Sequence, residues 1–301
     1  MLPSFQASDV SYGSLEKGLW RQQGGRRRLN FLPLVLSVVL PWLLFLTVYA
    51  IMAFSFHYSQ ATLSQLAVGL LLLAVLCFGA RAWAGRKAAE RDPTWMLFLA
   101  ASLLIAWIVA YVQGGADFSE NTSPYYDIQN LNNYVNVNPE LILGAQMQDA
   151  GIVTWAAGTK LDTTRSMGFK NKEMYCVAPI VMSKSVPTSY DFWAVGTGCC
   201  SGYQADFHCK NSDNPSANGA IRLMQSDRSF YRLAVQQAEA TYNIKASHPI
   251  FFTWEVDPYE EVNQWLKESH NRFVVWMMSY LVGQLFVVTV AAVVFSKVGE
   301  N

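Results

Sequence analysis

Four cysteines gather in one polar stretch and could form disulfides or bind a metal: Cys176, Cys199, Cys200 and Cys209. On an oxidising side of a membrane, four such cysteines predict two disulfides. A bond between the adjacent Cys199 and Cys200 would close a strained ring. Cys176 is therefore expected to pair with one of these two and Cys209 with the other, and both connectivities stay open. A zinc site formed by Cys199, Cys200, His208 and Cys209 is the alternative, but the spacing is not that of a zinc finger, so we expect no metal and no cofactor.

Asp206 and His208 are the candidates for acid–base chemistry in the same stretch, because they place a carboxylate close to an imidazole. Two residues apart in an irregular loop, they need not face each other, and an ordinary surface loop is the alternative. A nucleophilic Cys199 or Cys200 would compete with disulfide formation. The chain has no H-E-x-x-H, G-x-S-x-G, P-loop or dinucleotide-binding motif. The sequence therefore favours a protein that is not an enzyme.

Four apolar windows surround this stretch, at 31–56, 61–80, 94–112 and 273–295. Each reaches the roughly 20 residues that a helix needs to cross a bilayer. In hydrocarbon every backbone amide must be paired internally, so the windows predict a bundle of four transmembrane helices. They contain no Asp, Glu, Lys or Arg, which argues against an ion pathway or a proton relay. We expect Gln284, in the fourth window, to form a hydrogen bond between helices.

Basic residues near the ends of the windows predict the orientation, because the basic side of a span faces the cytoplasm. They precede the first window, lie between the second and third, and follow the fourth: Arg21, Arg26, Arg27, Arg28, Arg81, Arg86, Lys87, Arg91 and Lys297. We therefore expect 1–30, 81–93 and 296–301 to be cytoplasmic and 113–272 to be extracellular or lumenal, in the plasma membrane or an endomembrane. The formal net charge of zero gives no reason to expect nucleic acid as a partner.

The segment 113–272 is predicted to be an α+β domain held by disulfides. It begins with GGADFSENTSPYYD, which reads as a polar linker, and a short helix is expected from Pro139 to Gly151. Runs rich in β-branched and aromatic residues predict strands within 152–159, 174–182 and 190–197. An apolar period of 3.6 predicts an amphipathic helix in 227–244, with Phe230, Leu233, Ala234, Ala238 and Tyr242 on one face. A last helix begins after Asp257 and is expected to continue into the fourth span.

Two short motifs suggest processing or sorting. Asn121-Thr122-Ser123 is a glycosylation sequon on the predicted outer side, with an ordinary loop as the alternative. Tyr12-Gly13-Ser14-Leu15 matches a tyrosine-based sorting signal on the predicted cytoplasmic side, although a four-residue motif of this kind also recurs by chance.

The layout resembles that of a tetraspanin: a short first link, a basic second link and a large loop with a Cys-Cys pair between spans three and four. Here the pair continues as Ser201-Gly202, where the tetraspanin signature has glycine directly after the cysteines, so the likeness is one of architecture. Longer segments resemble a multicopy membrane-protein family of dinoflagellate algae: YDIQNLNNYVNVNP, TKLDTTRSMGFKNKEMYCVAPI, DFWAVGTGCCSGYQADFHC and FYRLAVQQAEATYNIKA. This resemblance implies that the chain has relatives in that family, but it supplies no activity and no functional residues.

The expected function is therefore that of a non-enzymatic membrane protein whose exported domain contacts a protein partner or a second copy. Such a protein could organise a membrane complex, mediate adhesion or act as an accessory subunit, with lipids around its spans. A membrane-tethered enzyme that uses His208 and Asp206 is the first alternative. A channel or transporter formed by oligomerisation of the spans is the second.

Overall fold

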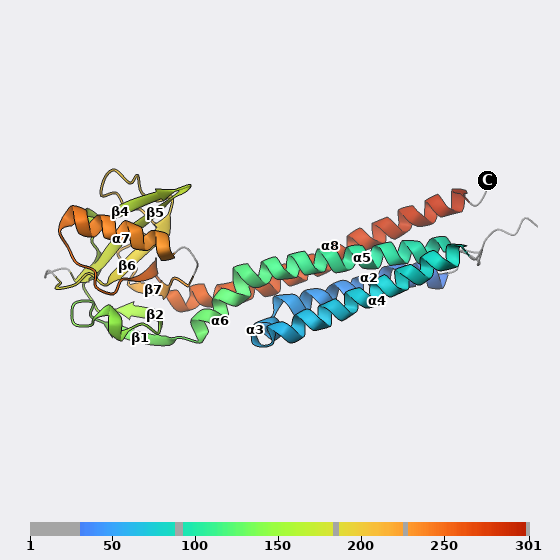
Figure 1. Cartoon of the computed structure of the whole chain (residues 1–301), viewed down its shortest axis with the longest axis horizontal. Coiled ribbons are helices and arrows are strands. Elements are labelled where there is room, and N and C mark those ends of the chain that lie inside the picture. Colours follow the sequence, from blue (N-terminus) through green and yellow to red (C-terminus); the bar gives the residue numbers. More distant parts are fainter. Residues whose placement is uncertain (1–30, 88–92, 183–186, 225–227, 299–301) are drawn as a thin grey trace, which may run out of the picture.

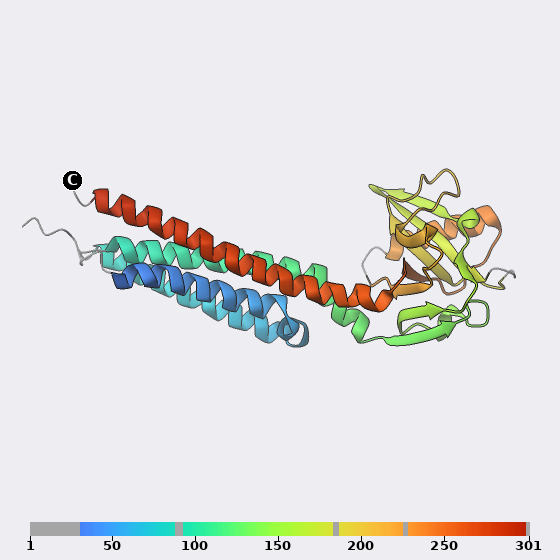
Figure 2. The same cartoon turned by 180° about the vertical axis from the view of Figure 1, so that it is seen from behind.

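The computed structural model describes residues 31–87, 93–182, 187–224 and 228–298. Long helices form one end of an elongated molecule and a β-sheet domain forms the other (Figures 1 and 2). We call residues 130–257 the sheet domain. The sorting motif Tyr12–Leu15, the basic residues before Phe31, and Arg91 lie outside the described residues.

Four helices are long and apolar enough to cross a membrane, as predicted. They are α2 (Phe31–Ala53), α4 (Ala61–Lys87), α5 (Pro93–Asp117) and α8 (Pro258–Val298). The first ends earlier than expected, because the chain leaves the helix at Phe54 and forms the short α3 (Ser55–Ser59) before it turns back. Large apolar side chains such as Leu70 and Phe286 point outward from the bundle, as they would if lipid covered them.

The bundle packs α2 against α5 and α8, and α4 against α5. Gly114 permits the close approach of α2 and α5, since a Cβ at this position would lie 3.0 Å from the Cβ of Met52. The predicted role of Gln284 is confirmed: its Nε2 donates to the backbone oxygen of Ser37 at 2.7 Å. This polar side chain therefore joins α8 to α2.

The expected linker after the third span is wrong, because α5 continues through a π-helical turn (Phe118–Thr122) into α6 (Ser123–Gln129). Buried hydrogen bonds offset the low helix propensity of this segment. The carboxyl group of Asp117, 1% exposed, accepts from Tyr49 Oη at 3.2 Å, Asn121 Nδ2 at 2.7 Å and Ser269 Oγ at 3.1 Å. We call these four residues the junction, since they join α2, α5 and α8 where the bundle ends.

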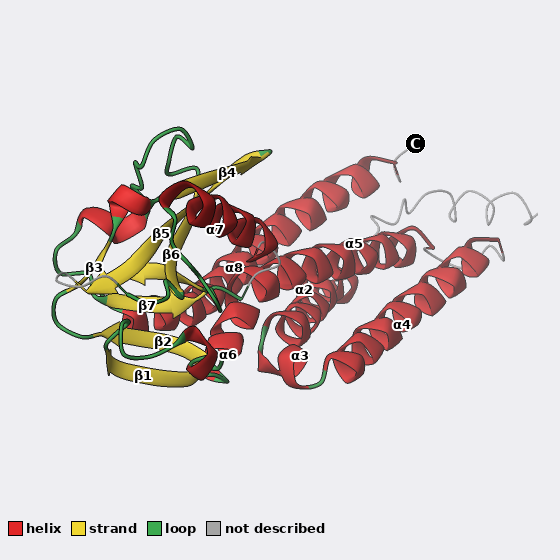
Figure 3. Ribbon diagram, turned by 60° about the vertical axis from the view of Figure 1, so that its left-hand side comes forward, coloured by secondary structure: helices red, strands yellow, loops and turns green. Residues whose placement is uncertain are grey.

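The sheet domain contains an eight-stranded sheet in the order β1-β2-β7-β8-β6-β5-β3, with β4 also paired to β5 (Figure 3). The strands are β1 (Asn132–Val137), β2 (Ala150–Trp155), β3 (Thr159–Leu161), β4 (Met167–Asn171), β5 (Glu173–Met182), β6 (Phe192–Thr197), β7 (Gly219–Arg222) and β8 (Ile250–Glu255). The three predicted strands correspond to β2, β5 and β6. The asparagine-rich β1 was not predicted as a strand.

The core lies on both faces of this sheet. On one face, α7 (Arg228–Tyr242) covers Val177, Trp193 and Phe251. On the other face, Cys176, Phe192 and Phe252 pack against loop residues, which include Met147 and Phe207. The helix α7 was predicted, but its buried face is centred on Tyr231, Ala234, Val235 and Ala238, and Leu233 is exposed instead.

The last helix begins as predicted, because Asp257 Oδ1 accepts the backbone N–H groups of Tyr259 and Glu260 at 3.1 and 3.0 Å. From there α8 runs without a break into the fourth apolar segment.

The helix expected from Pro139 to Gly151 is wrong; the segment is a loop with one short 3-10 turn, Gly144–Gln146. Asp191 fixes this loop, since its carboxylate accepts from the backbone N–H groups of Gly144 at 2.9 Å and His248 at 3.1 Å. It also accepts from Ser189 Oγ at 2.6 Å. A Cβ at Gly144 would lie 2.3 Å from the backbone oxygen of His248, so this close approach requires glycine.

Asp191→Asn is expected to lower the free energy of unfolding by about 2 kcal/mol at pH 7, because charge-assisted hydrogen bonds become neutral ones. Burial raises the pKa of Asp191, but the hydrogen bonds from Ser189, His248 and Gly144 outweigh it, so the net pKa is lowered. Stability from this carboxylate is therefore present above the ordinary pKa near 4 and is lost as the pH falls through the lower folded-state value.

Denaturant unfolding of the intact chain, followed by tryptophan fluorescence at several pH values, measures this effect. Asp213→Asn is the matched control, because the Asp213 side chain is 78% exposed, and it should change stability by no more than about 0.5 kcal/mol. An equal loss for both variants, or a loss for Asp191→Asn that does not shrink in acid, would contradict the assignment.

Candidate functional site

Two disulfides form in the sheet domain, and the structure selects one of the two open connectivities. Cys176 pairs with Cys200, and Cys199 pairs with Cys209, with Cα–Cα distances of 5.9 and 5.0 Å. Glycines make room for both. A Cβ at Gly168 would lie 2.9 Å from Cys200 Sγ, and one at Gly196 would lie 2.7 Å from Cys199 Sγ. The first disulfide thus holds the cysteine loop, 199–209, against β4 and β5.

The alternative zinc site does not fit this chemistry. The sulfurs of Cys176, Cys199 and Cys209 do lie within 4.8 Å of one another. Zinc binds thiolates, however, and sulfurs that are joined in disulfides offer none. The side chain of His208 points elsewhere, toward Asp213, with Nδ1 3.5 Å from Oδ2.

The candidate acid–base pair is not assembled. Ser201 donates its backbone N–H to both carboxylate oxygens of Asp206 at 3.0 Å each, and its hydrogen bonds lower the pKa of this group. The His208 side chain is 69% exposed. Asp206 therefore shapes the cysteine loop, and a general base needs a hydrogen-bonding geometry that these two residues do not provide.

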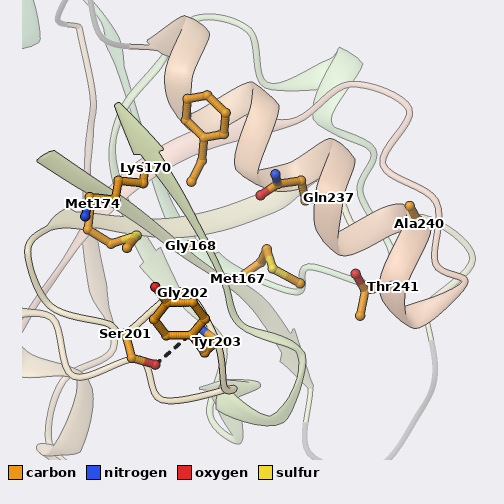
Figure 4. Close-up of a pocket in the computed structure, with 11 residues that line it drawn as sticks. Met167, Gly168, Lys170, Met174, Ser201, Gly202, Tyr203, Gln237, Ala240 and Thr241 are labelled. Atoms are coloured by element: carbon orange, nitrogen blue, oxygen red, sulfur yellow. Dashed lines mark hydrogen bonds between the residues drawn. The ribbon is translucent and has the colours of Figure 1, made fainter. Parts of the chain in front are cut away.

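Beside the cysteine loop lies an open cleft of about 540 Å³ (Figure 4). Its lining combines thioether, aromatic and small residues from β4, β5, the cysteine loop and α7: Met167, Gly168, Phe169, Lys170, Met174, Ser201, Gly202, Tyr203, Gln237, Ala240 and Thr241. The first four are consecutive residues of β4. Methionine and aromatic side chains are typical of surfaces that bind apolar groups of varied shape.

Both walls of the cleft are held in place. One wall is the second half of α7, whose last residue, Tyr242, donates its hydroxyl to the backbone oxygen of Ser166 at 2.9 Å, directly before β4. The other wall is 201–203, anchored by the Cys176–Cys200 disulfide and by the Tyr203 N–H, which donates to Ser201 Oγ at 3.3 Å. Tyr203 itself is 91% exposed. The cleft is thus a fixed hollow with one aromatic side chain at its mouth.

The lining carries one charged group, the Lys170 ammonium, and no cysteine, histidine or carboxylate. Such a lining can bind an apolar ligand with a negatively charged group near one end, and it offers no obvious nucleophile–base pair. No local sequence signal points to this site, because its residues come from β4, β5, the cysteine loop and α7.

Asn121, the acceptor of the predicted sequon, lies in the junction rather than in a loop. Its side chain is 3% exposed and its Nδ2 donates to Asp117. In the folded chain this amide nitrogen is therefore engaged inside the protein.

Comparisons with known proteins add no relative: no protein-family model, no curated protein and no solved structure matches the chain. The resemblance to an algal family and the tetraspanin-like layout stay predictions.

Proposed function

We propose that the protein is a non-enzymatic membrane protein whose sheet domain, on the extracellular or lumenal side, binds a partner protein. The observation that carries this proposal is the cleft, with Met167, Phe169, Met174 and Tyr203 in its lining. Methionine and aromatic residues are enriched in protein interfaces, where they gain more from burial than charged residues do. Partner binding would cover the exposed ring of Tyr203, which otherwise stays in water.

Continuous helices between the bundle and the sheet domain support this function. The sheet domain follows α6 directly and precedes α8, so two helices connect it to the bundle (Figure 1). Ile128 of α6 and Val262 of α8 pack with Ile152 and Ile221 of the sheet. Such a connection would present the cleft at a constant orientation to the membrane, which suits an organiser or an accessory subunit. The basic residues beside the spans favour the extracellular or lumenal side for the sheet domain.

The two alternatives receive less support. Asp206 accepts from Ser201 and the His208 ring faces Asp213, so these two residues do not form the hydrogen-bonded pair that the tethered-enzyme alternative needs. Gln284, a buried polar side chain of the bundle, donates to the backbone oxygen of Ser37 in α2, so it joins two helices.

The test is affinity purification of the tagged intact chain after gentle detergent extraction from the cells that make it. We expect a defined partner that is lost when Tyr203→Glu places a charge at the mouth of the cleft. Leu141→Glu is the matched control, since Leu141 is an 80% exposed apolar residue of the sheet domain outside the cleft. A partner that both variants retain, or a chain that purifies alone, would contradict the proposal.

A further inference from the structure

The strand β4 has one paired edge and one open edge. It pairs with β5 in an antiparallel register from Met167 opposite Val177 to Asn171 opposite Glu173. Within the described parts of the chain, no strand pairs with its other edge. An open edge presents a row of backbone N–H and C=O groups that can pair with another extended chain.

The cleft follows this open edge. Its floor includes the consecutive residues Met167, Gly168, Phe169 and Lys170. Side chains alternate along a strand, and here Met167 and Phe169 pack on the α7 side while Gly168 faces Cys200 and Gly202. The wall formed by α7 and the wall formed by 201–203 therefore stand on opposite sides of the same strand edge.

The chemistry of this recess selects the occupant. Apolar side chains on both faces of the β4 edge suit the side chains of an extended chain, and the Lys170 ammonium suits a carboxylate on that chain. An extended peptide meets the backbone groups of β4 with its main chain and sends alternate side chains toward the two walls.

We propose that β4 is a strand-addition site, where a partner protein inserts an extended, mainly apolar segment that pairs with the backbone of Met167–Lys170. This assignment rests on the proposed function and names its binding mode. Side chains on one face of the segment contact Met167, Phe169 and α7, and those on the other contact Met174 and Tyr203. A carboxylate on the segment pairs with the Lys170 ammonium at the exposed end of the cleft.

The test uses the intact chain in lipid nanodiscs and a displayed library of random linear peptides. Selected peptides should alternate apolar residues and include a carboxylate. Binding, measured by fluorescence anisotropy, should weaken about fivefold to tenfold in Lys170→Glu. N-methylation of the peptide backbone should weaken binding by about tenfold at every second residue and have little effect at the residues between, because only alternate amides face β4.

Hydrogen exchange gives a second readout that does not depend on variants of the chain. Peptide binding should slow exchange at backbone amides of β4 on its open edge. Strand addition is overturned if peptides bind but tolerate N-methylation at every position and leave the amides of β4 unprotected. The proposed partner-binding function would still stand in that case. Failure to select any peptide would also overturn strand addition. The proposed function fails separately, if Tyr203→Glu retains every partner of the intact chain.

Discussion

Replacing Cys176 and Cys200 by alanine is expected to lower the free energy of unfolding of the sheet domain by about 3.5 kcal/mol from loop-closure entropy alone. Their sequence separation is 24 residues, against 10 for Cys199 and Cys209, for which the same reasoning gives about 2.7 kcal/mol. Loss of the first disulfide also releases 201–203 from β4, so the cleft should open with it.

Denaturant unfolding of both double variants, with Cys77→Ala as the control, measures this difference. Cys77 is a free, exposed cysteine in α4, and its replacement should leave the sheet domain unchanged. The prediction fails if the Cys199–Cys209 variant is the less stable of the two, or if neither variant differs from the unmodified chain.

Asp117→Asn is expected to destabilise the junction by about 2 to 4 kcal/mol. The carboxyl group accepts hydrogen bonds from Tyr49, Asn121 and Ser269, which come from three helices. The side-chain amide of asparagine has the same size but only one acceptor oxygen. Its NH2 group would face donors that now bind the second carboxylate oxygen of Asp117. The helices should therefore separate where the bundle ends, and the sheet domain should take up a range of orientations.

Spin labels on α4 at position 70 and on α7 at position 236, with Cys77 replaced, report this orientation through their distance distribution. Asp117→Asn should broaden that distribution. Glu120→Gln is the control one helical turn away, because the Glu120–Arg272 ion pair is exposed and contributes little. A distribution as narrow in Asp117→Asn as in the control would contradict the role of the junction.

The four long helices and the strands β2, β5 and β6 were predictable, because apolar length and β-branched runs are local signals. The strand β1 carries no such signal, since asparagine is disfavoured in strands. It forms because it pairs with β2 and because Tyr134 and Asn132 donate to Asp149. The continuous helix through Gly114 and Asp117 also has no local signal in the sequence. It forms because these two residues make tertiary contacts with α2 and α8.

The disulfide connectivity also depended on the fold. Cys199 and Cys200 are adjacent, and the sequence offers no reason to prefer one of them as the partner of Cys176. In the fold, Cys200 faces Gly168 on β4 while Cys199 faces Gly196 and Cys209. The cleft depends on this choice, since it is Cys200 that brings Gly202 and Tyr203 to the edge of β4.

Site-specific photo-crosslinking in intact cells tests most directly whether the cleft is the partner-binding surface. A photoreactive amino acid at position 203 should crosslink one defined protein, and the same group at position 141 of the sheet domain or at position 70 of α4 should not. Two results would contradict a partner-binding role of the cleft. One is crosslinking of that protein from position 141 or 70 with equal yield, and the other is no crosslinked protein at position 203.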